Sequence, residues 1–112
     1  LHALYVVDGA AYSSLEAGAE IVVEALESEG KEATGRVAEA AADADVECVS
    51  TVVSGTAYRS IQDYVDEHDI DVVVMGTHGR KGIDRYLLGS VTERVVRTSD
   101  VPVLTVRQPA DE

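Results

Sequence analysis

The order of apolar segments along the 112 residues predicts an α/β fold: an open, twisted parallel sheet with helices on both faces. Strand-like runs rich in Val and Thr alternate with helical stretches, which is typical of a layered α/β domain. The run Ile70–Met75 is the apolar kind of strand that parallel sheets bury on both faces. Hydrophobic residues make up 46% of the chain, so we expect one domain over residues 1–112.

The first half of the chain is expected to begin with a strand and a long helix. Leu1–Asp8 is an apolar run that ends at an Asp-Gly turn signal. Ser13 and Glu16 have the spacing of a capping box ahead of an amphipathic stripe. Gly30 and Gly35 lie inside this helix, cost it about 1 kcal/mol each relative to Ala, and are candidates for a bend. The stripe consists of Leu15, Ala19, Val22, Leu26, Ala33, Val37 and Ala40.

The second half continues the alternation of strands and helices. The expected elements are a strand at Val46–Val53, a helix from Ala57 to about His68, a strand at Ile70–Met75, a glycine-rich loop over 76–89, a helix from about Ser90 and a strand at Val101–Val106. Ligands of parallel α/β sheets bind at the carboxyl ends of the strands, so the loop after Met75 is the expected place for a site.

The charge of the chain restricts its partners and suggests its surroundings. It carries 21 acidic and 9 basic residues, a net charge of −12, which argues against nucleic acid as a partner. No apolar run approaches the length of a membrane span. The single cysteine, Cys48, excludes a disulfide framework and fits a reducing cytoplasm. A surface rich in carboxylates and poor in lysine is what we expect of a protein from a cytoplasm at molar salt.

Basic residues gather late in the chain. Residues 1–75 hold 3 bases and 16 acids, whereas residues 76–107 hold 6 bases and 3 acids. Such a basic island on an acidic chain is a candidate anion site, although the same arginines could simply pair with neighbouring carboxylates. The island consists of Arg80, Lys81, Arg85, Arg94, Arg97 and Arg107.

The glycine-rich loop offers backbone donors rather than a known phosphate motif. It has neither the P-loop spacing nor the dinucleotide fingerprint. Gly76, Gly79 and Gly89 are free to adopt positive φ and expose N–H groups. Ser90 and Glu93 match a capping box at the start of a helix, whose N-terminus attracts anions. The alternative is an ordinary glycine-rich connection before a capped helix.

The pattern Gly76-x₂-Gly79-x₉-Gly89-Ser90 resembles the glycine motif of the ATP-binding branch of the universal stress protein family. The stretch VVVMGTHGRKGIDRYLLGSVTERVVRTSDVPVLTVR is similar to the C-terminal signature of that family, and the resemblance extends upstream through GTAYRSIQDYV to LYVVD. It implies a parallel sheet of five strands in the order 3-2-1-4-5, with adenosine at the strand ends and phosphates over the glycine loop.

The resemblance also implies a role for individual residues. Val6 would offer backbone groups to adenine, and Gly76 would lie against the ribose. The phosphate contacts would come from Gly79, Gly89, Ser90 and Val91, with Arg80 at a usually basic position. Mg²⁺ bridging the phosphates would fit, because this ion takes many of its ligands from substrate oxygens. The ligand would be ATP, or AMP or ADP.

One part of the family pattern is not found in these residues. LYVVD matches the second strand of the family, so the resemblance implies a preceding strand and helix of roughly 30 residues. In the order 3-2-1-4-5 that strand lies in the middle, and without it two strand groups would have unpaired edges. We therefore expect the working protein to have this strand, from residues outside these 112 or from another chain.

Three functions compete on this sequence. The first is an ATP-binding stress-response module that forms a homodimer through the last strand, Val103–Arg107. The second is a family member without nucleotide that acts as a dimeric interaction protein. The third, a slow ATPase, is the weakest, because hydrolysis needs a positioned base and only His78 and Asp84 are candidates. The expectation is therefore a binding protein with no catalytic residues and no protein metal site.

Overall fold

The computed structural model describes residues 1–8, 19–77 and 89–107, with the side chains of 19–22 left aside. The chain forms two compact units, Leu1–Ser60 and Ile61–Glu112. Helices and strands alternate through both units, and both pairs of strands are parallel, which confirms the predicted α/β class. No helix among the described residues is long and apolar enough to cross a membrane.

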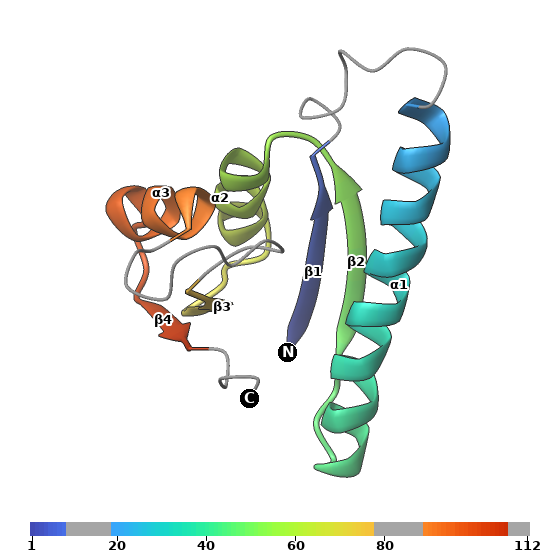
Figure 1. The fold of residues 1–112 in the computed structure, drawn as a ribbon. Helices are drawn as coiled ribbons and strands as arrows, with labels where there is room; N and C mark the ends of the chain where they lie inside the picture. Colours follow the sequence, from blue (N-terminus) through green and yellow to red (C-terminus); the bar gives the residue numbers. More distant parts are fainter. Residues whose placement is uncertain (9–18, 78–88, 108–112) are drawn as a thin grey trace. The chain divides into compact units, whose positions relative to one another are not determined.

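The first unit is a parallel strand pair covered by one long helix. Strands β1 (His2–Val7) and β2 (Val49–Ser54) pair in register along their whole length. Helix α1 (Ala19–Asp43) connects them and packs along both strands (Figure 1). The core of this unit is small because many of its members are short side chains. The buried apolar residues are Ala3, Val7, Leu26 and Ala41.

A close contact between α1 and β1 explains one of the two helical glycines. A Cβ at Gly30 would lie only 2.6 Å from Cδ1 of Tyr5, so glycine is needed where the aromatic ring meets the helix. The Tyr5 hydroxyl donates to Oε2 of Glu29 at 2.6 Å, which holds the ring in this position. Gly35 has no atom within 4 Å of its Cβ position. The helix runs unbroken through both glycines, so neither splits it.

Aspartates in the left-handed conformation end both α1 and α2 (Ala57–Glu67). Asp45 has φ 59°, and the next residue, Val46, donates its N–H to the Ala41 carbonyl at 2.8 Å. Asp69 has φ 51°, and Ile70 makes the equivalent bond after α2. These are Schellman caps, which usually use glycine, so the aspartates do not indicate in the sequence where these helices end.

The second unit holds another parallel pair. Strands β3 (Val73–Gly76) and β4 (Val103–Val106) pair in register, and α3 (Ser90–Thr98) lies between them in the chain. Val73 faces a hollow that α2 and α3 also line, with Val65 and Val95 among the lining residues. One face of this short sheet therefore meets the helices.

The opposite face of the β3–β4 pair is open, contrary to the prediction that this strand is buried on both faces. Val74, Leu104 and Val106 are 60%, 58% and 50% exposed. Side chains alternate between the faces of a strand, and no described element of this unit covers the face that these three share.

The strands form two separate pairs, β1–β2 and β3–β4, rather than one sheet. These pairs are the two strand groups expected from the sequence. The complete order 3-2-1-4-5, and the single domain over 1–112, stay predictions.

Candidate functional site

The end of β3 and the start of α3 are joined by direct hydrogen bonds. The N–H of Gly89 donates to the Thr77 carbonyl at 2.7 Å. The Thr92 hydroxyl donates to the Gly76 carbonyl at 2.8 Å. Thr77 in turn donates its N–H to the Val106 carbonyl at 3.1 Å, which continues the ladder with β4. The two ends of the glycine-rich loop are thus held together at the carboxyl end of the sheet, as the sequence predicted.

The helix that begins here has no side-chain cap. Its N-cap is Gly89, not Ser90, and Ser90 is the first helical residue and exposed. The predicted capping box of Ser90 and Glu93 is therefore wrong. The physical reason is that Gly89, tied to Thr77 and in extended conformation, starts the helix one residue early. Backbone N–H groups in the first turn, including those of Ser90 and Val91, have no partner inside the helix and remain available to an anion.

The described loop glycines do not use the positive φ that is open to glycine. Gly89 has φ −63° and ψ 156°, and Gly76 is an ordinary strand residue. Among the described glycines only Gly55 has a positive φ. Any residue could adopt the backbone of Gly89, so its conformation does not require glycine.

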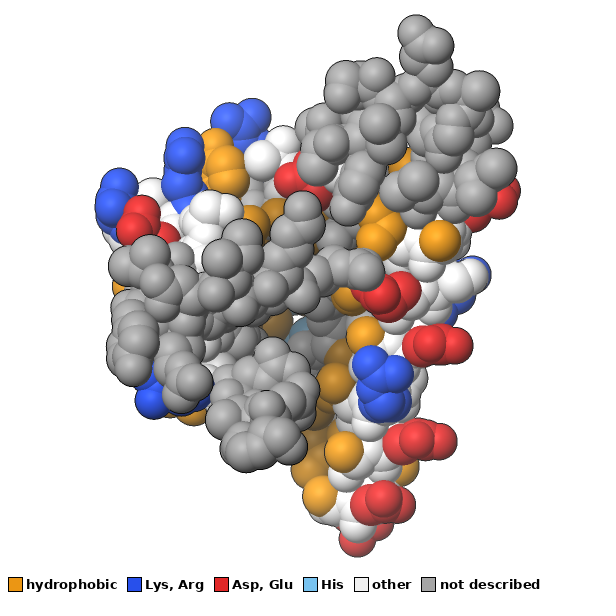
Figure 2. Space-filling view, viewed as in Figure 1, with side chains coloured by type: hydrophobic (Ala, Val, Ile, Leu, Met, Phe, Trp, Pro, Cys, Tyr) orange, Lys and Arg blue, Asp and Glu red, His pale blue; other side chains and the backbone are white. Residues whose placement is uncertain are grey.

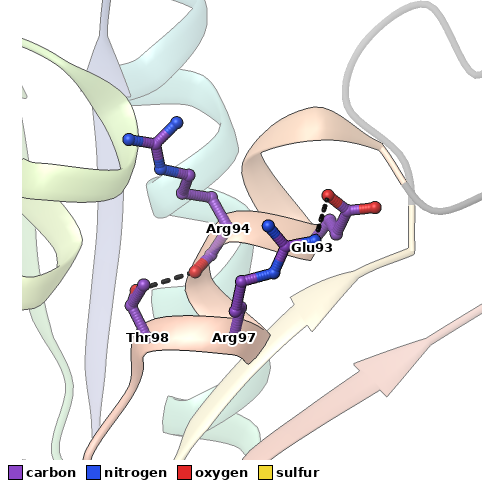
Figure 3. Close-up of polar contacts among 4 residues, drawn as sticks. All are labelled: Glu93, Arg94, Arg97 and Thr98. Atoms are coloured by element: carbon purple, nitrogen blue, oxygen red, sulfur yellow. Dashed lines mark hydrogen bonds and ion pairs between the residues drawn. The ribbon is translucent and has the colours of Figure 1, made fainter.

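The described part of the basic island includes one formed ion pair. Arg97 donates to Glu93 one turn earlier at 3.0 Å, with both side chains largely exposed (Figure 3). Such surface pairs contribute at most a few tenths of a kcal/mol. Arg94 points away from this pair and accepts, through its carbonyl, the Thr98 hydroxyl at 2.7 Å. The alternative that the arginines simply pair with carboxylates thus holds for Arg97.

Acidic side chains collect on the other unit. Figure 2 shows Asp and Glu side chains along α1 with a few basic side chains between them, whereas the basic residues of α3 are two arginines. The exposed acids of α1 are Glu24, Glu27, Glu32, Glu39 and Asp43. The charge division along the sequence is therefore also a division between the surfaces of two helices. Among the described residues, no three His, Cys, Asp or Glu side chains gather closely enough to hold a metal ion.

Val6 lies in the first unit and directs its backbone groups away from β2. The N–H of Gly55 donates to the Val7 carbonyl at 2.9 Å, so Val7 faces β2. Successive residues of a strand turn their backbone N–H and C=O groups to opposite edges. The N–H and C=O of Val6 therefore face the edge of β1 that does not pair with β2.

The residues predicted for the site divide into three groups. Gly76, Gly89, Ser90 and Val91 come together where β3 ends and α3 begins. Val6 belongs to the first unit, and Gly79 and Arg80 lie outside the described residues. Sequence reasoning missed two participants, Thr77 and Thr92. Thr92 could have been found, because it lies three residues before the buried Val95 and so shares the inward face of α3.

The family model for the universal stress protein family matches residues 1–107. The chain belongs to this family. Among curated relatives, universal stress protein MJ0531 of Methanocaldococcus jannaschii is 36% identical over 114 residues, covering 100% of this chain and 67% of the relative. A putative universal stress protein of Staphylococcus aureus is 32% identical and covers 95% of this chain and 67% of that relative.

Solved structures agree with this assignment. The universal stress protein UspA from Lactobacillus plantarum superposes with a TM-score of 0.81 at 29% identity, covering 96% of this chain and 77% of that one. The Methanocaldococcus jannaschii protein MJ0577, whose structure was described as a structure-based assignment of biochemical function, gives a TM-score of 0.81 at 27% identity, covering 98% and 76%. The fold of this universal stress protein is therefore shared with its relatives over nearly the whole chain.

Proposed function

We propose that this universal stress protein binds an adenine nucleotide, ATP first among them, and acts as a binding module of the stress response in the cytoplasm. The observation that carries the proposal is the start of α3. An uncapped helix N-terminus is held against the carboxyl end of β3 by the Gly89–Thr77 and Thr92–Gly76 hydrogen bonds. Free N–H donors and the positive end of a helix dipole suit a phosphate group.

The roles within the proposed site follow from the direction of each backbone group. The N–H groups of Ser90 and Val91, with the Ser90 hydroxyl, would contact phosphate oxygens, and Gly89 leaves room for their approach. Gly76 would lie against the ribose, and the outward-facing backbone of Val6 suits the edge of adenine. Gly79 and Arg80 would add phosphate contacts, as the family motif implies. Mg²⁺ would bridge the phosphates through nucleotide oxygens.

Binding is a better proposal than catalysis for this site. The described side chains where β3 meets α3 belong to Thr77, Ser90, Val91 and Thr92, which are hydroxyl-bearing or apolar. A hydroxyl near neutral pH is a poor base for activating water unless a neighbouring group takes its proton. The remaining candidates from the sequence, His78 and Asp84, lie outside the described residues.

The second part of the proposal is a homodimer formed through β4. The carbonyls of Pro102 and Val106 accept hydrogen bonds from β3, so the backbone groups of Val103 and Thr105 face the outer edge of the strand. Within the described residues this edge has no strand beside it. An unpaired edge can add a strand from a second copy by backbone pairing.

Calorimetric titration with Mg-ATP tests the nucleotide part of the proposal. Replacing Gly89 with leucine puts a side chain where the phosphates would approach, at a backbone conformation that leucine adopts freely. We expect a loss of affinity of about a hundredfold or more, equal to about 2.7 kcal/mol. The matched control is Gly35→Leu, where nothing lies within 4 Å of the Cβ position.

The control variant should bind Mg-ATP as the unchanged chain does, and both variants should keep the same oligomeric state. Equal affinity of Gly89→Leu and the unchanged chain would refute the proposed site. An unchanged chain that binds no Mg-ATP would favour the second candidate function, a dimeric interaction protein without nucleotide.

A further inference from the structure

Thr92 is the most deeply buried polar side chain described in the second unit, with 3% of its surface exposed. Its hydroxyl donates to the Gly76 carbonyl at 2.8 Å. That carbonyl is not part of the ladder with β4. The N–H groups of Val73 and Thr77 donate to β4, so the backbone of the intervening even-numbered residues, Val74 and Gly76, faces the other edge of β3. Thr92 therefore gives a partner to a carbonyl that the strand pair leaves open.

We propose that Thr92 is a positioning residue for nucleotide binding, which fixes the first turn of α3 on the end of β3 and so aims the N–H groups of Ser90 and Val91 at the phosphates. The inference rests on the proposed function. Thr92 acts together with the Gly89–Thr77 bond, since the two hydrogen bonds tie adjacent points of the strand end to the same helical turn.

The physical benefit of this arrangement is that the donors are ordered before the ligand arrives. Bringing the two ends of a loop together costs conformational entropy. If the donors are ordered only when the ligand binds, this cost is subtracted from the binding free energy and the affinity falls. Two hydrogen bonds made on folding remove that cost from the binding step. Removal of the Thr92 hydroxyl leaves only the Gly89–Thr77 bond, and the first turn of α3 then separates more readily from β3.

The test compares three variants of the full chain. Thr92→Val keeps the shape of the side chain and removes its donor, whereas Thr92→Ser keeps the donor. Thr98→Val is the matched control. Thr98 lies at the opposite end of α3 from the site, and its hydroxyl also donates to a backbone carbonyl, that of Arg94. Two quantities are measured: the affinity for Mg-ATP by calorimetry, and the hydrogen-exchange rate of the Gly89 amide in nucleotide-free protein.

We expect Thr92→Val to bind Mg-ATP about tenfold more weakly. Without the Thr92 hydrogen bond, the first turn of α3 has to be ordered during binding, and this ordering lowers the affinity. Its Gly89 amide should exchange about tenfold faster, because opening of the turn breaks the Gly89–Thr77 bond. Thr92→Ser should restore both quantities to within about threefold, and Thr98→Val should leave both within about twofold of the unchanged chain.

Other results overturn the inference in distinguishable ways. If the unchanged chain binds Mg-ATP and Thr92→Val binds it equally well, Thr92 does not position the site and the proposed function stands. The same conclusion follows if Thr92→Val lowers only the temperature of unfolding, because a merely structural residue would do that. If the unchanged chain does not bind Mg-ATP, the proposed function fails and this inference fails with it.

Discussion

The two glycines inside α1 should respond in opposite ways to replacement by alanine. In a helix interior alanine is favoured over glycine by about 1 kcal/mol, which applies equally to Gly30 and Gly35. At Gly35 a new Cβ meets nothing within 4 Å. At Gly30 it would lie 2.6 Å from Cδ1 and 2.9 Å from Cγ of Tyr5. The Cγ atom is the root of the ring, so a rotation of the ring alone does not relieve the contact.

The magnitude follows from these two opposing effects. Inserting a carbon into a packed contact costs about 1–3 kcal/mol, and the hydrogen bond from Tyr5 to Glu29 resists displacement of the ring. After the gain in helix propensity, Gly30→Ala should lower the free energy of unfolding by up to about 2 kcal/mol. Gly35→Ala should raise it by about 1 kcal/mol.

Urea unfolding followed by far-ultraviolet circular dichroism measures both changes, with the variants compared at one high salt concentration. Because the two substitutions are chemically identical and lie on the same helix, their difference isolates the contact with Tyr5. A stability gain for Gly30→Ala equal to that for Gly35→Ala would refute the packing of β1 against α1 described above.

Four further results are expected. Asp45→Gly should raise the free energy of unfolding by about 1 kcal/mol in urea titrations, because glycine adopts the left-handed conformation of the cap without strain. A lower free energy of unfolding would contradict this cap. Asp8→Ala should lower the free energy of unfolding by about 0.5–1 kcal/mol in the same assay, because the Asp8 carboxylate accepts a hydrogen bond from the Ala57 N–H at the start of α2. An unchanged free energy of unfolding would show that this hydrogen bond does not stabilise α2. If the proposed homodimer forms through β4, Thr105→Pro should yield a monomer in light scattering, because it removes an outward N–H of this strand. A dimer that persists in the variant would place the interface elsewhere. Dilution from molar KCl into low-salt buffer should unfold or aggregate the chain, because 21 acids then repel with little screening; a folded, monodisperse protein would contradict the high-salt hypothesis.

The sequence predicted the type and order of every described element but placed several of their ends wrongly. Strand β3 begins at Val73 rather than Ile70, and β2 at Val49 rather than Val46. The preceding helices end in Schellman caps built on aspartate, and these caps take up residues that composition alone assigned to strands. Aspartate is common in turns of many kinds, so its presence does not indicate a left-handed cap.

The sequence predicts that the glycine-rich loop lies at the carboxyl end of β3, but it does not predict the hydrogen bonds found there. The glycine motif places Gly76 at the end of β3 and Gly89 at the start of α3, and so indicates that these two ends meet. The partner of a buried hydroxyl depends on the separation and tilt of α3 and β3, which no spacing in the sequence encodes. Thr92 therefore received no role from the sequence, and only the geometry links it to the Gly76 carbonyl.

Binding of an adenine nucleotide where β3 meets α3 can be tested without any variant. The protein is purified in molar KCl and denatured, and the released nucleotides are separated by ion-pair chromatography and compared with the protein concentration. We expect ATP, or AMP or ADP, in stoichiometric amount. A protein that releases no nucleotide and also fails to bind added Mg-ATP would contradict this expectation.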